Sequence, residues 1–432
     1  MRGIARIRST AVRPVRICAG LDTRRGIWYD EAGSAIRLRS VYTAQEARMN
    51  FDALDRYLDT FYQEKNIPGL GCAVAVRGEI VHRHFAGFQD VERGIPFGED
   101  TLVNLYSATK ISTAAAVMRM VEQGFFGLDT PAAEILPELG DVTVRREDGS
   151  VTPAENVMLV RHLFSMSAGF SYDGTGRAMR DLLRETDGRP KTRQVVRALA
   201  EEPLLFEPGT HFKYSYCLDV LAAVMEEAAG IPYPEILRRE LFEPLGMEDT
   251  GFTLTDGQRT RLGPEYHGFD AKTGRAREVI FREGFDMGMG PEYRSGGGGL
   301  ISSVGDYAKL AAMLANRGVT ADGKRILSEE SIDAMRTNQL GREAMEDYDR
   351  FGGWSKAGYG YGLGVRTLLD PERNNSLSVK GEFGWDGALG CYLLADPDTA
   401  GGVGIFYAQQ EGGSPWYTWH GLIRNYAYAG IL

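Results

Sequence analysis

Two β-hairpin patterns, one in the first quarter of the chain and one close to its C-terminal end, most constrain the fold of this 432-residue sequence. Residues 70–89 form two apolar β runs that break at Arg77-Gly78-Glu79, a combination typical of a tight turn. Residues 389–409 repeat the pattern, with Asp396-Pro397-Asp398 at the turn. The stretch between the hairpins is mostly helical in its apolar spacing. The simplest fold is α+β: an antiparallel sheet built from both chain ends, flanked by helices, with a mainly helical region inserted.

Apolar residues recur at helical spacing in six internal segments and in one closing segment. These segments are residues 111–123, 192–202, 216–229, 233–241, 304–317, 328–337 and 416–428. Together with the hairpins they predict one domain over residues 49–432, an α/β sandwich joined to a helical region. In this domain we expect residues 49–105 and 290–432 to contribute the sheet and residues 106–289 to contribute the helical part.

Residues 1–48 differ in composition from the rest of the chain. They hold ten arginines, no lysine and four acidic residues, whereas the whole chain has a net charge of −10. Such a composition is also typical of a transit peptide, but we favour a poorly ordered leader ahead of a folded protein that opens at Met49. The segment has no apolar run of the length that a secretory signal or a membrane helix requires.

The charge and the cysteines bear on partners and location. A net charge of −10 and a pI near 5.3 disfavour nucleic acid or an anionic membrane surface as a partner. Because we find no secretory signal, we expect a cytoplasmic protein with reduced thiols. The four cysteines predicted to be free are Cys18, Cys72, Cys217 and Cys391. Their spacing gives no zinc or redox signature, and we expect no metal and no cofactor.

A serine three residues before a lysine, Ser107 and Lys110, stands at the start of an apolar helical pattern that runs from Leu105 to Gln123. Residues three apart share a face of a helix, so the Lys110 amine can lie beside the Ser107 hydroxyl. The helix N-terminus adds free N–H groups and the positive end of the dipole. Acyl transfer needs these parts: a nucleophile, a base and donors for an oxyanion. Alone the pattern is weak, and an ordinary helix start with a solvated lysine is the alternative.

Other conspicuous motifs favour structural interpretations. The glycine runs at 296–299 and 358–362 lack the spacing of nucleotide-binding loops, and close backbone approach near a cleft or sheet edge is the favoured use. His82 and His84 would point to the same side of a strand and are predicted to form a surface pair rather than a metal site. Lys272-Thr273-Gly274 is predicted to be a polar turn, because no apolar strand precedes it.

Two further motifs, taken with Ser107, indicate a family. Tyr214-Ser215-Tyr216 precedes the helical run CLDVLAAVMEEAAG, and Trp385-Asp386-Gly387 precedes the C-terminal hairpin. In this order the three motifs resemble those of the serine β-lactamase and penicillin-binding protein superfamily, specifically its class C-like branch. The resemblance runs from about Phe51 to the C-terminus. It includes Glu122-Gln123-Gly124, Leu128-Asp129, residues 162–169, Glu243-Pro244-Leu245-Gly246-Met247 and residues 296–303.

The chain departs from the β-lactamase pattern at two places. The second motif of the family is Tyr-x-Asn, and here Tyr216 replaces the asparagine that helps to hold the amide side chain of a β-lactam. The third motif is Lys-Thr-Gly or a variant, and here only Gly387 is kept, so the cation that pairs with the β-lactam carboxylate is missing. With Trp385 in the third motif and a Leu-Asp-Val-Leu helix after Tyr-Ser, the chain is similar to the family VIII carboxylesterases, which prefer uncharged esters.

The resemblance implies a role for each of these residues. Ser107 would be the nucleophile, and Lys110 and Tyr214 would share the general-base work and return the proton to the leaving alcohol. The N–H groups of Ser107 and Ala388 would form the oxyanion hole. The residues that contact the substrate would be Tyr216, Trp385, Asp386 and Gly387.

The leading hypothesis is therefore a serine hydrolase that cleaves small carboxylic esters through an acyl-enzyme on Ser107. The alternatives use the same fold: a β-lactamase, an amidase or peptidase, or an acyltransferase that passes the acyl group to an acceptor other than water. A penicillin-binding protein that traps the acyl group without turnover is a further alternative. Each of these enzymes would act on a small-molecule ester or amide.

Overall fold

The computed structural model describes residues 21–22, 27–29, 35–37, 49–352 and 356–432. The chain divides into two units, Met1–Arg48 and Met49–Leu432. In the first unit, the described residues form three short antiparallel strands in the order β1-β2-β3, namely Leu21–Asp22, Ile27–Tyr29 and Ala35–Arg37. The other residues of the predicted leader, Cys18 among them, lie outside the described residues.

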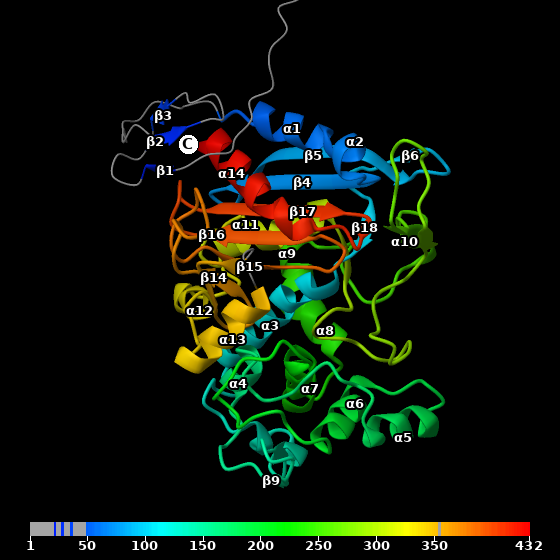
Figure 1. Cartoon of the computed structure of the whole chain (residues 1–432), viewed down its shortest axis with the longest axis vertical. Helices are drawn as coiled ribbons and strands as arrows, with labels where there is room; N and C mark the ends of the chain where they lie inside the picture. Colours follow the sequence, from blue (N-terminus) through cyan, green and yellow to red (C-terminus); the bar gives the residue numbers. More distant parts are fainter. Residues whose placement is uncertain (1–20, 23–26, 30–34, 38–48, 353–355) are drawn as a thin grey trace, which may run out of the picture. The chain divides into compact units, whose positions relative to one another are not determined.

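An eight-stranded antiparallel sheet forms the centre of the second unit (Figure 1). Its strand order is β13-β14-β15-β16-β17-β4-β5-β6. The strands are β4 (Gly69–Val76), β5 (Glu79–Asp90), β6 (Ile95–Pro96), β13 (Tyr359–Tyr361), β14 (Arg366–Leu368), β15 (Phe383–Asp386), β16 (Tyr392–Asp396) and β17 (Val403–Gln409). The N-terminal hairpin joins the C-terminal one where β4 pairs with β17. The prediction of an antiparallel sheet built from both chain ends is confirmed.

The turn between β4 and β5 has the geometry that its sequence predicts. Arg77 and Gly78 both have left-handed backbone angles, with φ of 54° and 81°, as two-residue hairpin turns require. Every residue of β4 is buried, whereas the first half of β5 alternates between exposed and half-buried residues. Strand β4 is therefore a central strand with both faces covered, and β5 turns one face to solvent.

Helices cover both faces of the sheet. Val403, Ile405 and Tyr407 of β17 belong to one buried cluster, which also includes residues of α1 (Asp52–Asp59), α2 (Phe61–Lys65) and α14 (His420–Ile431). Phe406 and Ala408, which alternate with them, belong to a second cluster with α3 (Thr109–Glu122) and α11 (Val304–Ala315). In Figure 1, α1 and α14 lie on one side of the sheet and α11 lies behind it. This part is a three-layer sandwich.

A helical region continues from α3 on the side of the sheet away from α1 (Figure 1). Its helices are α4 (Val160–Phe164), α5 (Arg177–Glu185), α6 (Thr192–Ala200), α7 (Cys217–Ala229) and α8 (Tyr233–Leu237). Helix α7 ends at Gly230, whose φ of 67° is the left-handed conformation typical of a helix C-terminus. The helices predicted at 192–202 and 216–229 are α6 and α7, with ends that differ by at most two residues from the prediction.

Shorter elements connect these layers. The helices are α9 (Glu243–Leu245), α10 (Asp256–Arg259), α12 (Glu329–Met335) and α13 (Arg342–Gly352). The strands are β7 (Leu102–Asn104), β8 (Thr143–Arg145), β9 (Val151–Pro153), β10 (Glu265–His267), β11 (Glu278–Ile280), β12 (Ile301–Ser303) and β18 (Glu411–Gly412). Strand β10 pairs with β18, so part of the predicted helical region joins the C-terminal end of the chain. No helix among the described residues is long and apolar enough to cross a membrane.

Candidate active site

The predicted pair Ser107 and Lys110 lies at the start of α3. Strand β7 leads into a single 3₁₀ turn, Tyr106–Ala108, which continues directly into the helix. The Nζ atom of Lys110 lies 3.1 Å from Oγ of Ser107 and donates a second hydrogen bond, of 2.6 Å, to the carbonyl oxygen of Gly297. Lys110 is fully buried, whereas Ser107 is half-buried. The structure thus holds an amine beside a reachable hydroxyl, as their spacing on a helix predicts.

Tyr214 and Trp385 complete one wall around this pair. The Nζ atom of Lys110 lies 4.6 Å from the centre of the Tyr214 ring, close enough for a cation–π contact. The indole Nε1 of Trp385, on β15, donates a hydrogen bond of 3.0 Å to the Tyr214 hydroxyl. This bond fixes the hydroxyl as an acceptor for the indole and leaves its own proton free to point elsewhere. The structure brings Ser107, Lys110, Tyr214 and Trp385 to one place.

The turn after β15 lies against the segment that carries the serine. A side chain on Gly387 would come within 2.2 Å of the carbonyl oxygen of Leu105, so only glycine fits there. Its neighbour Ala388 is exposed, and among the described residues no acceptor is bound to the Ala388 N–H. The N–H of Ser107 lies at a helix start, where such groups lack a partner within the helix. These are the two donors expected to form an oxyanion hole.

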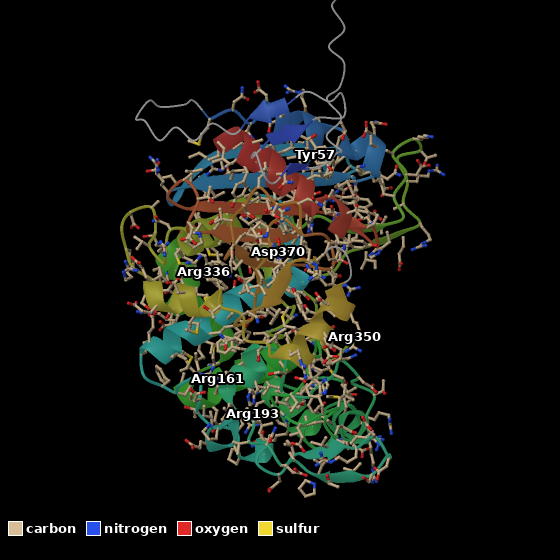
Figure 2. The ribbon with its side chains drawn as sticks, turned by 60° about the vertical axis from the view of Figure 1, so that its left-hand side comes forward. Tyr57, Arg161, Arg193, Arg336, Arg350 and Asp370 are labelled. Atoms are coloured by element: carbon tan, nitrogen blue, oxygen red, sulfur yellow. The ribbon has the colours of Figure 1, made fainter. Side chains whose placement is uncertain are left out.

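Tyr214 is one of the residues that line an open cavity of about 790 Å³. Its walls are aromatic and its rim is charged: the lining residues are Ser171, Tyr172, Asp173, Phe212, Lys213, Tyr214, Asp347, Arg350 and Phe351. Arg350, on α13, lies in Figure 2 between the level of Tyr57 on α1 and that of Arg193 in the helical region. Tyr216, predicted to contact substrate, is buried against the Tyr172 ring, with centroids 4.8 Å apart, and does not line the cavity.

Asp386 occupies a different environment from the one the prediction gave it. Successive residues of a strand point to opposite faces of the sheet. Trp385 contacts Tyr214, whereas the side chain of its neighbour Asp386 is buried among cations. Its carboxylate bonds Lys356 and lies 3.1 Å from Nη1 of Arg366. Burial alone would raise the pKa of Asp386, but Lys356 and Arg366 outweigh it and hold the pKa well below the usual range. The structure therefore gives the Asp386 carboxylate two cationic partners within the protein, and its predicted contact with substrate stays a prediction.

Comparison with known proteins identifies the family. Residues 54–427 match the model of the Beta-lactamase family. The chain belongs to the β-lactamase family. It is 34% identical to the esterase EstB of Burkholderia gladioli over 369 residues, which cover 79% of this chain and 86% of EstB. It is 30% identical to protein Rv1367c of Mycobacterium tuberculosis over 358 residues, which cover 81% of this chain and 88% of that protein.

Solved structures agree with this family. This β-lactamase-family chain is similar to EstCE1, a hydrolase with promiscuous acyltransferase activity, with 27% identity and a TM-score of 0.69 over 88% of this chain and 97% of EstCE1. It also shares the fold of the simvastatin synthase LovD from Aspergillus terreus, with 20% identity and a TM-score of 0.70 over 88% of this chain and 97% of LovD. The predicted class C-like fold is confirmed.

Three residues near the serine of this β-lactamase-family protein, Asn104, Tyr106 and Glu265, escaped the sequence analysis. Tyr106 has a φ of 48°, a left-handed conformation that is strained for a residue with a side chain. Its hydroxyl donates a hydrogen bond of 2.8 Å to the buried carboxylate of Glu265 on β10. The amide of Asn104 donates one of 2.6 Å to the other carboxylate oxygen. Glu265 therefore accepts hydrogen bonds from the residues on both sides of Leu105, just before Ser107 in the chain.

The remaining motifs lie elsewhere in the β-lactamase-family fold. His82 and His84 pair with Asp55 and Asp59 of α1, at 2.7 Å and 2.8 Å. The run Lys272-Thr273-Gly274 forms the polar turn that was predicted, closed by a hydrogen bond of 2.9 Å from the Gly274 N–H to the carbonyl oxygen of Asp270. Within the described ranges, no group of His, Cys, Asp and Glu side chains could hold a metal ion. The described cysteines are free and buried: Cys72, Cys217 and Cys391.

Proposed function

We propose that this protein is a serine hydrolase that cleaves small carboxylic esters through an acyl-enzyme on Ser107. The observation that carries the proposal is the distance of 3.1 Å between the Lys110 amine and the Ser107 hydroxyl. A nucleophilic serine needs a base within hydrogen-bond reach, and this amine meets that condition. The 34% identity to the esterase EstB supports an ester as the substrate.

The geometry supports the following sequence of steps. Oγ of Ser107 attacks the ester carbonyl carbon while its proton passes to Lys110 and Tyr214, whose ring lies against that amine. The N–H groups of Ser107 and Ala388 stabilise the oxyanion. The proton then goes to the leaving alkoxide, so that the alcohol departs and an acyl-serine remains. A water molecule, activated by the same groups, attacks the acyl carbon, and the carboxylic acid leaves as Ser107 recovers its proton.

The cavity supports an uncharged substrate with an apolar or aromatic part. Its aromatic walls, Tyr172, Phe212, Tyr214 and Phe351, offer flat apolar surface for such a group. The rim holds two acidic and two basic side chains, so it gives no net preference for a charged substrate. The third motif also supports an uncharged substrate, because Trp385, which bonds Tyr214, stands where a β-lactamase would have a cation.

Aryl esters should therefore be much better substrates than β-lactams. We expect kcat/KM for the best p-nitrophenyl ester of a short acyl chain to exceed that for a chromogenic cephalosporin by at least about tenfold, since a charged hydrogen bond to the β-lactam carboxylate, worth about 1.5–3 kcal/mol, is missing. Parallel initial-rate measurements on the two substrates test this. Equal efficiency on both would overturn the esterase proposal in favour of a β-lactamase.

Acyl transfer is a second candidate, favoured by the likeness to EstCE1, a hydrolase with promiscuous acyltransferase activity. The open cavity at Tyr214 leaves room for an alcohol to take the place of water. The same ester assay, run with a small alcohol present, distinguishes the two reactions by the ratio of new ester to free acid.

We further propose that residues 49–432 form the whole catalytic domain and that the enzyme acts in the cytoplasm. Every residue of the candidate site lies in this unit, and the family match begins at residue 54. A chain that starts at Met49 should keep the Tm and the esterase rate of the full chain. Calorimetry and the p-nitrophenyl assay on both chains check this, and a Tm lower by more than a few degrees would contradict it.

A further inference from the structure

A buried carboxylate lies behind Lys110 and takes no part in the steps above. Asp219, on α7, has no exposed surface. Its Oδ1 atom accepts hydrogen bonds from the hydroxyls of Tyr293 and Ser295, at 2.5 Å and 2.6 Å, and from the N–H of Gly297, at 3.4 Å. Its Oδ2 atom has no hydrogen-bond partner among the described residues. Oδ1 thus accepts three hydrogen bonds, whereas Oδ2 is buried and accepts none from the described residues.

The Oδ2 atom of Asp219 faces Lys110 across Gly297. A methyl group placed on Gly297 would lie 2.8 Å from Oδ2 of Asp219, 3.2 Å from Nζ of Lys110 and 3.3 Å from the hydroxyl oxygen of Tyr172. The amine and the carboxylate oxygen are therefore no more than about 6 Å apart, a separation at which unit charges interact strongly in a protein interior. Glycine at position 297 keeps any side chain out of the space between them.

The hydrogen bonds indicate that Asp219 carries its charge there. Three donors converge on Oδ1, and a proton on Oδ2 would find no acceptor, so the hydrogen-bond pattern suits a carboxylate. Burial raises the pKa of Asp219 above its usual value, and Ser295, Tyr293 and the charge of Lys110 offset only part of that rise. A buried charge is stable only when it is paired, and Lys110 is the cation that faces it.

We propose that Asp219 is a positioning residue that acts through Lys110: its carboxylate, across Gly297, stabilises the ammonium form of Lys110 and so sets the pH at which the amine becomes a base. This inference rests on the proposed roles of Ser107 and Lys110. It adds a third member to the proton-transfer system, one that does not touch the substrate.

Five titratable side chains around the pair have a pKa raised by burial and stay neutral near pH 7. The side chains that face Lys110 or Asp219 from the neighbouring elements are Tyr172, Tyr214, Tyr216, Cys217, Tyr233 and Tyr293. Burial raises the pKa of Tyr172, Tyr233 and Tyr293 well above neutrality, and it raises the pKa of Cys217 to about 11 and that of Tyr216 to about 12. These five side chains therefore add no charge beside the Lys110–Asp219 pair near neutral pH.

The replacement Asp219→Asn, which removes the charge and keeps the shape, tests the proposal. Without the carboxylate, Lys110 should lose its proton at a lower pH, so the midpoint of the acid limb of kcat/KM for a p-nitrophenyl ester should fall by about one pH unit or more. The measurement is a pH–rate profile of the full-length chain. A midpoint equal to that of the natural protein would overturn the proposal.

Two further variants separate charge from packing. Ser295→Ala removes one donor to the carboxylate and should move the midpoint in the same direction by less, which keeps the proposal testable if Asp219→Asn does not fold. Tyr233→Phe is the matched control, because it removes a buried hydroxyl bound to Thr113 and leaves Asp219 with its hydrogen bonds; its midpoint should not move. An equal shift in this control would overturn the proposal.

Labelling separates this proposal from the proposed function. If a fluorophosphonate does not label Ser107 of the natural protein, the proposed function itself fails. If it labels Ser107 and the midpoints of the natural protein and Asp219→Asn coincide, only the role of Asp219 fails.

Discussion

Replacing Ser107 by alanine should abolish covalent labelling by a fluorophosphonate and lower kcat for ester hydrolysis by about 10³-fold or more. The Ser107 hydroxyl is the nucleophile in the proposed mechanism, and only the oxyanion donors and substrate binding remain without it. The fold should be unaffected, because Ser107 is half-buried and its replacement by alanine leaves no large void. Mass spectrometry of the labelled protein and steady-state kinetics measure the two effects.

Ser165→Ala is a matched control for this experiment. Ser165 is a buried serine at the end of α4 whose hydroxyl bonds the carbonyl of Arg161, and it belongs to no part of the proposed machinery. This variant should label and turn over as the natural protein does. Stoichiometric labelling of Ser107→Ala would show that another residue is the nucleophile.

Replacing Asp386 by alanine should destabilise the protein by about 3–5 kcal/mol, the usual cost of removing one member of a buried ion pair. Lys356 and Arg366 would be left as buried cations without this carboxylate. Chemical denaturation measures the loss as a change in the free energy of unfolding. Asp333→Asn serves as a control, because Asp333 is exposed and Arg336 keeps Asp398 as a partner, so the loss should be well under about 1 kcal/mol.

The same carboxylate should make stability depend on pH. The cations hold the pKa of Asp386 below its unfolded value of about 3.9, so its contribution is complete above that pH and is lost as the pH falls through the lower, folded value. The natural protein should therefore lose more stability on acidification below about pH 4 than Asp386→Asn does. Equal losses in the two proteins, or a small cost of Asp386→Ala, would show that Asp386 is not the charged centre of this cluster.

The elements that could be predicted from the sequence are those set by local pattern. Short apolar runs broken by turn residues locate both hairpins, and Arg77-Gly78 favours a turn wherever the strands come to lie. The spacing of Ser107 and Lys110 on a helix brings their side chains together without help from the rest of the chain. Helix ends also follow local signals, as Gly230 shows at the end of α7.

What could not be predicted depends on partners distant in sequence. Asp386 seemed available to substrate because its sequence neighbours are site residues, but Lys356 and Arg366, 30 and 20 residues earlier, enclose it. Asp219 looks like an ordinary polar position of an amphipathic helix until Tyr293, 74 residues later, is packed against it. No periodicity encodes such contacts, because they arise only when separate segments pack together.

The pairing of β4 with β17 has a consequence for biosynthesis. Strand β4 is complete once residue 76 has been made, but its partner spans Val403–Gln409, so the ribosome must add more than three hundred residues before that edge is covered. During that time β4, apolar on both faces, offers an open edge to other chains. The sheet can close at this edge only after Gln409 has been made, so chaperone protection of the nascent chain is most valuable at the β4–β5 hairpin.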